Sequence, residues 1–160
     1  MIHVWYWMQH NSWVVAIDNS TVGALTVECI HYLGFFIAVG AIVLVDLRVL
    51  GLAGRRQTLT EFGNQLFSLM WIGLGLVVFS GFMMFAASAE QFARNPVFHF
   101  KLYIILFALV FNIIVQRGLR KWDRLPTIPA ASKIVAIISL LLWIGTIIAA
   151  VEVPALTGVG

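Results

Sequence analysis

Four long apolar stretches dominate the chain, and short polar segments separate them. A helix needs about 20 predominantly apolar residues to cross the hydrocarbon core of a bilayer. Four stretches reach that length, and they predict membrane-spanning helices at residues 22–45, 66–87, 97–116 and 134–151. Short links favour antiparallel packing of consecutive helices. The pattern therefore predicts one domain over residues 1–160, an all-α integral membrane four-helix bundle.

Polar residues mark the starts of three of these helices. Asn19 or Ser20 precedes the first span, in the position of a helix cap. Thr58 and Glu61 form the pattern of a capping box, so the second helix is predicted to begin before its apolar part. The pair Asn95-Pro96 offers a cap followed by proline at the first helical position of the third span.

The two ends of the chain are predicted to lie outside the hydrocarbon core. Residues 3–17 are rich in tryptophan, which prefers the headgroup region, and they lack the basic segment of a secretory signal. We expect this segment to be a short interfacial helix that lies flat on the membrane. Pro154 and Gly158 are expected to end the fourth span.

Charge reports the orientation of the helices. Of the 160 residues, 61% are hydrophobic and only 11% are charged, with a net charge of +3. The basic residues gather between spans one and two and between spans three and four, which predicts that both loops face the cytoplasm of a bacterial inner membrane. Both termini are then periplasmic, an N-out/C-out topology. Because these residues do not form one basic face, nucleic acid is not expected as a partner. The expected partner is the lipid bilayer.

Three ionisable side chains inside the apolar stretches need an explanation: Glu28, His31 and Lys101. Such groups are costly in a membrane and are candidates for function. Glu28 and His31 are three residues apart and share a helix face. At 1.5 Å per residue, Glu28 lies roughly 9 Å and Lys101 roughly 8 Å below the outer surface, so the two are expected to meet. The pair is either a structural salt bridge or a site for an anionic group such as a haem propionate.

His31 is either a hydrogen-bonded packing residue or an axial ligand of b-type haem. Gly34 follows it on the same face and then Ala38, so the helix offers a smooth strip on which a flat ring or another helix can lie. His99 is the candidate for a second axial ligand, although at roughly 5 Å deep it lies higher than His31, at roughly 13 Å.

Other metal sites are less well supported by the spacing of the ligands. The Glu-x-x-His unit of Glu28 and His31 is typical of di-iron bundles, but these need a second such unit, and the chain has one. Copper is a further alternative, because imidazole and thioether groups suit it. Its candidate ligands are His3, Met8, His10, Met83 and Met84. The single cysteine, Cys29, excludes an internal disulfide and is expected to be a small buried apolar residue.

The inner ends of spans one and three carry charge without a catalytic pattern. Asp46 and Arg48 close the first span, and the run QRGLRKWDRLP closes the third. We expect these residues to be solvated anchors at the lipid headgroups, with Trp122 in the interfacial belt.

Three segments resemble a known family: HYLGFFIAVGAIVLVDLRVLG in the first span, NPVFHFKLYIILF in the third, and VEVP near the end. They are similar to small four-helix bacterial membrane proteins related to copper-resistance protein D and to the HemJ-type protoporphyrinogen oxidase. The resemblance implies a haem-linked histidine at His31 with Lys101 as its polar companion. HemJ-type proteins have a further histidine late in the third span, where this chain has Asn112 and Gln116, so protoporphyrinogen oxidation is not expected.

These observations favour a b-type, cytochrome-like membrane protein that binds haem and transfers electrons. One alternative is a non-catalytic accessory subunit of a larger respiratory, photosynthetic or transport complex. Another is a metal-handling or solute transporter, although no span shows the broken helix common in transporters. Nothing in the sequence requires enzymatic turnover.

Overall fold

The computed structural model describes residues 2–157, with side chains from residue 4 to residue 149, and this part of the chain is helical with short connections. The elements are α1 (Ile2–Gln9), α2 (Ser12–Asp18), α3 (Thr21–Val49), α4 (Leu59–Ala87), α5 (Ala89–Ala93), α6 (Pro96–Trp122) and α7 (Ala130–Thr157). Four of them, α3, α4, α6 and α7, are long and apolar enough to cross a membrane. The predicted fold class, an all-α membrane four-helix bundle, is confirmed.

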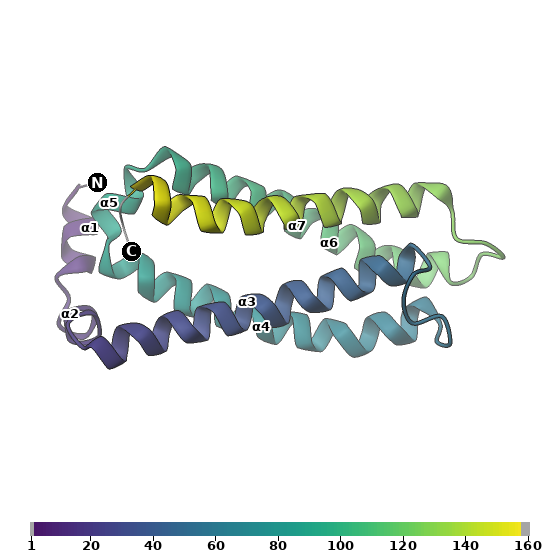
Figure 1. The fold of residues 1–160 in the computed structure, drawn as a ribbon, viewed down its shortest axis with the longest axis horizontal. Helices are drawn as coiled ribbons and strands as arrows, with labels where there is room; N and C mark the ends of the chain where they lie inside the picture. Colours follow the sequence, from purple (N-terminus) through teal and green to yellow (C-terminus); the bar gives the residue numbers. More distant parts are fainter. Residues whose placement is uncertain (1, 158–160) are drawn as a thin grey trace.

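The four long helices run side by side, with both termini at one end of the bundle (Figure 1). We call this the terminal end, and we call the opposite end, which holds the connections at residues 50–58 and 123–129, the loop end. The α3 helix packs most extensively on α4, and α6 packs on α7. Contacts of α3 with α7 and of α4 with α6 close the ring. The helices α3 and α6 therefore occupy diagonal corners.

The core lies in the middle of the bundle and toward the loop end. One cluster of buried side chains is built around Val39, Ile42, Met70, Ala108 and Trp143. A second, nearer the loop end, is built around Val45, Val49, Leu59, Val115 and Leu119. In the terminal half, the buried residues of the long helices are small, among them Gly34, Gly73, Ser80, Ala86 and Thr146. The two helix pairs are thus joined mainly through the loop half.

The predicted helix starts are confirmed. The Ser20 side chain accepts a hydrogen bond from the Gly23 amide at 3.2 Å, so Ser20 rather than Asn19 is the cap of α3. Thr58 and Glu61 form both hydrogen bonds of the capping box at the start of α4. At the start of α6, the Asn95 side chain accepts from the Val97 amide at 2.9 Å, and Pro96 takes the first helical position.

The ends of the chain differ from the sequence prediction. The single interfacial helix expected at residues 3–17 is two short helices, because the backbone of Asn11 is extended and interrupts the helix between α1 and α2. The α1 helix lies across the terminal end (Figure 1). Its Trp5 ring packs edge-on to the Phe85 ring of α4, with the two ring centroids 5.7 Å apart. The α7 helix also continues through Pro154 to Thr157, whereas the sequence predicted a stop. Membrane helices tolerate proline when neighbouring groups satisfy the freed carbonyl.

Asp123 ties the end of α6 to the start of α4 at the loop end. Its carboxylate follows α6 and accepts hydrogen bonds from the backbone amides of Leu59 at 2.8 Å and Thr60 at 2.9 Å. These amides begin α4 and lack partners within their own helix. The expectation that the run after α6 is only a solvated anchor is therefore incomplete, because Asp123 in that run joins two spans.

Candidate functional site

His31 is fixed against α4 by a hydrogen bond from its side chain. The Nδ1 atom of His31 lies 3.0 Å from the Ser80 hydroxyl oxygen. That hydroxyl donates to the Leu76 carbonyl at 2.5 Å, so its oxygen is left to accept. Ser80 can therefore accept from a proton on Nδ1, and a neutral imidazole held in this way has its lone pair on Nε2. The partly buried His31 ring is thus oriented by Ser80.

Gly81 gives the imidazole its place beside α4. A methyl group at Gly81 would lie 3.1 Å from the Cε1 atom of His31, closer than most side-chain contacts. Ser80 and Gly81 thus bind and accommodate the same ring. Sequence reasoning missed both, although a Ser-Gly pair within an otherwise bulky apolar span is a signal of close approach by another group.

The small-residue strip that follows His31 is covered by α4. A methyl group at Gly34 would lie 2.7 Å from the Leu76 Cβ and 2.9 Å from the Gly73 carbonyl oxygen. A methyl group at Gly73 would lie 2.6 Å from the Ala38 amide nitrogen. Of the two uses expected for this strip, close helix packing is the one that the structure shows, and no flat ring can lie on Gly34.

Lys101 lies on the inward face of α6. It precedes the buried residues Ala108 and Asn112 by 7 and 11 positions, close to two and three helical turns, so the three share one face. Its side chain is half-buried. Lys101 therefore points to the interior from α6, the helix diagonal to α3, which carries His31.

Glu28 does not form the predicted salt bridge with Lys101. It lies beside Tyr32, one turn further along α3. Among the residues that the structure describes, the ion pair within 4.0 Å joins Glu90 and Arg94 at 2.7 Å. The predicted depths took no account of the position of each helix in the ring, and α3 and α6 stand at diagonal corners.

His99 is separated from this region. It is exposed, and it lies two residues, or about 200° around the helix, from the inward-facing Lys101. The structure therefore does not place His99 opposite His31 as a second axial ligand.

The copper alternative concerns histidines and methionines near the terminal end. Among the described residues, no three His, Cys, Asp or Glu side chains are placed to hold one metal ion. The His10 ring stacks on the Tyr6 ring, with their centroids 4.0 Å apart, and its Nδ1 atom forms a hydrogen bond with the Tyr6 carbonyl. Met84 is exposed. The side chain of His3 lies outside the described residues.

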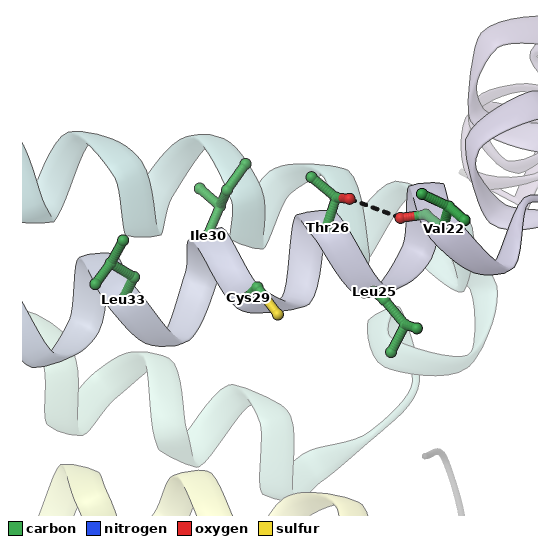
Figure 2. A pocket seen from close by; sticks show the side chains of 6 residues that line it. All are labelled: Val22, Leu25, Thr26, Cys29, Ile30 and Leu33. Carbon is green, nitrogen blue, oxygen red and sulfur yellow. Dashed lines mark hydrogen bonds between the residues drawn. The ribbon is translucent and has the colours of Figure 1, made fainter.

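The surface groove shown in Figure 2 belongs to a single helix. Its lining comes from successive turns of α3: Val22, Leu25, Thr26, Cys29, Ile30 and Leu33. The Thr26 hydroxyl donates to the Val22 carbonyl at 2.7 Å, so this polar group is already satisfied. Cys29 is exposed here, contrary to its predicted burial, and lies about 200° around α3 from His31. The groove is a lipid-facing surface separate from the histidine.

Asp46 forms a second polar position, which the sequence analysis assigned wrongly. It was expected to be solvated at the headgroups, yet its side chain is only 1% exposed. It faces Ser139 of α7. The helical period does place Asp46 on the buried face with Ile42 and Val49, which was the available signal.

Comparison with known proteins gives one family. No curated protein and no solved structure matches the chain. The model of a family of unknown function, DUF6644, matches residues 6–153, which cover all four spans. The chain therefore belongs to the DUF6644 family.

Proposed function

We propose that this protein binds b-type haem through His31 and transfers single electrons within a bacterial inner membrane, with both termini on the periplasmic side. The topology is supported by the basic residues of the two connections, which lie together at the loop end (Figure 1). The haem assignment is supported by the hydrogen bond between His31 and Ser80 and by the resemblance of the first and third spans to haem-linked four-helix proteins.

The observation that carries the proposal is the hydrogen bond from His31 Nδ1 to Ser80. Histidines that bind a metal almost always donate their other ring N–H to a protein acceptor, which fixes the tautomer and the ring orientation. In this chain the donor set fits the first requirement of a haem ligand, a neutral imidazole with Nε2 available. Ser80 holds that state, and Gly81 allows the ring to lie against α4.

Lys101 supplies the second feature that a haem site needs, a cation for a propionate group. It lies on the inward face of α6, and it forms no ion pair with the described acidic residues. An ammonium group in an apolar interior is stabilised when a carboxylate binds beside it. Because α4 covers Gly34, haem held by His31 would not lie on Gly34.

When bound, haem supplies a one-electron couple between ferrous and ferric iron. The residues that would hold it are His31, which would bind the iron through Nε2, Ser80, which would keep the proton on Nδ1, and Lys101, which would neutralise a propionate.

A titration of haem-free protein with hemin in detergent tests the proposal. Wild type is expected to bind one equivalent with saturation, and His31→Ala is expected to bind about tenfold or more weakly. His99→Ala is the matched control, because His99 is an exposed histidine in the same half of the bundle, and it is expected to bind as wild type does. Equal affinity of wild type and His31→Ala would overturn the assignment.

A further inference from the structure

The carboxyl group of Asp46 is buried between α3 and α7, near the loop end of the bundle. It lies three residues before the last residue of α3, Val49, and its side chain is 1% exposed. On α7, Ser139 faces Asp46 and is 0% exposed, and Trp143, one turn further along that helix, is 3% exposed. This position is on the opposite half of the bundle from His31, so the inference does not depend on haem binding.

Three buried polar side-chain atoms of these residues have no well-formed hydrogen bond among the described residues. They are the Oδ2 atom of Asp46, the Oγ atom of Ser139 and the Nε1 atom of Trp143. Ser139 and Trp143 are four residues apart on one helix and therefore lie on the same face, one turn from each other. Buried polar groups are normally hydrogen-bonded, so three together indicate a built site for a small polar ligand.

No cation faces Asp46 from the helices that pack on α3. The titratable residue at this end of α4 is Glu61, which is held in its capping box. At the loop end of α7 the charged residue is Lys133, which is exposed at the start of that helix. The α2 helix offers only Asp18, an exposed residue at the terminal end.

Arg48, two residues beyond Asp46, is turned away from the carboxyl group. It donates from Nη2 to the Gln57 carbonyl at 2.5 Å, and its charge acts on Asp123. The described residues contain no ion pair that includes Asp46. Two residues separate the pair by about 200° around the helix, so Arg48 and Asp46 point to opposite sides.

An ionised carboxylate in this position would be a buried charge without a counter-ion, which is far more costly than a neutral carboxylic acid. A carboxylic acid and the Ser139 hydroxyl can each donate or accept a hydrogen bond, and the Trp143 N–H can donate one, so a water molecule, which accepts two and donates two, can bond to all three. Internal waters are typically held by such otherwise unsatisfied groups.

We propose that Asp46 is a proton-binding site inside the membrane, where the protonated carboxyl group shares a buried water molecule with Ser139 and Trp143. The chain thereby holds a group that takes up and releases a proton within the bundle, close to the loop end. The bound ligand is a proton on the Asp46 carboxyl group, and Ser139 and Trp143 of α7 hold the water molecule beside it.

Infrared spectroscopy of the full-length protein in detergent at neutral pH tests this inference. Wild type is expected to show the C=O stretch of a protonated carboxylic acid, shifted to lower frequency in D₂O. Asp46→Asn, a neutral replacement of the same shape, is expected to remove this band, and Glu28→Gln, which changes the other acidic residue of α3, is expected to retain it. Absence of the band from wild type, or its persistence in Asp46→Asn, would overturn the proposal.

Ser139→Ala provides a second test that leaves Asp46 in place. Loss of a hydrogen-bonding group beside the carboxyl is expected to raise the frequency of the Asp46 band. Ser68→Ala, which changes an exposed serine of α4, is the control and is expected to leave the frequency unchanged. An unchanged frequency in Ser139→Ala would contradict the shared site.

Discussion

The carboxylate of Asp123 binds the backbone amide of Leu59 at 2.8 Å, so the residue that ends α6 also caps the beginning of α4. A second oxygen of the same carboxylate accepts from Thr60 at 2.9 Å. One side chain thereby satisfies two amides that the helix itself leaves free. This contact links the start of α4 to the end of α6, and so the α3–α4 pair to the α6–α7 pair, at the loop end.

Removal of this cap is expected to destabilise the bundle. Asp123→Ala should lower the free energy of unfolding by about 1 kcal/mol, as is typical for the loss of a helix cap. The measurement is the unfolding midpoint in detergent, with Arg124→Ala as the control at the neighbouring exposed position. If both variants unfold at the same midpoint as wild type, the cap contributes nothing.

The same contact predicts a dependence on pH. Desolvation acts to raise the pKa of Asp123, but hydrogen bonds from Thr60 and Leu59 and the charge of Arg48 outweigh it, and the pKa lies below its ordinary value of 3.8. A lowered pKa in the folded state means that the stabilisation is complete above the ordinary value and is lost as the pH falls through the folded value. The difference in midpoint between wild type and Asp123→Asn should therefore shrink on acidification below about pH 4. A difference that stays constant there would contradict this account.

Close packing of α3 on α4 predicts a contrast between two glycines of α4. Gly73→Ala places a methyl group 2.6 Å from the Ala38 amide nitrogen, and a backbone atom cannot move aside cheaply. The expected cost is about 1–3 kcal/mol in the free energy of unfolding. Gly75→Ala is the control, because nothing lies within 4 Å of its added methyl group. A Gly73→Ala variant as stable as Gly75→Ala would show that the two helices do not meet at this point.

The spans and their starts could be predicted because each depends on local sequence. The apolar lengths indicate four helices, and the caps at Ser20, Thr58 and Asn95 each form hydrogen bonds within a few residues of themselves. The break at Asn11 was missed, because an asparagine within a short segment can either continue a helix or cap the next one.

The partners of the polar residues could not be predicted, because they depend on the register and order of the helices around the ring. Depth alone suggested that Glu28 meets Lys101, yet their helices are diagonal. Ser80 was not identified as the partner of His31, since 49 residues separate them. Asp46 looked solvated because it is near the end of a span, whereas its face of α3 is covered by α7.

The diagonal arrangement predicts that Glu28 and Lys101 do not stabilise each other. In a double-mutant cycle of Glu28→Gln and Lys101→Met, the coupling free energy is expected to be below about 0.5 kcal/mol, the range for residues that are not in contact. Lys101→Met alone should not lower the unfolding midpoint of the haem-free protein, because it removes an unpaired charge from the interior. A coupling of about 1 kcal/mol or more would indicate the salt bridge that the structure lacks.

The hydrogen bond from His31 predicts an effect of Ser80 on haem binding. Ser80→Ala removes the acceptor that fixes the ring, and affinity for hemin is expected to fall by about 10- to 100-fold, the effect of losing a partner of a metal-bound histidine. Ser68→Ala, on the exposed side of the same helix, is expected to bind as wild type does. Equal affinity of the two variants would show that Ser80 does not orient His31 for a ligand.

The most direct test of His31 as a haem ligand is the visible absorption spectrum of the protein purified from cells with ample haem. Wild type is expected to show a Soret band, and bands that sharpen on reduction with dithionite, while His31→Ala produced in the same way is expected to show neither. A colourless wild type, or a His31→Ala variant with the wild-type spectrum, would contradict the central claim.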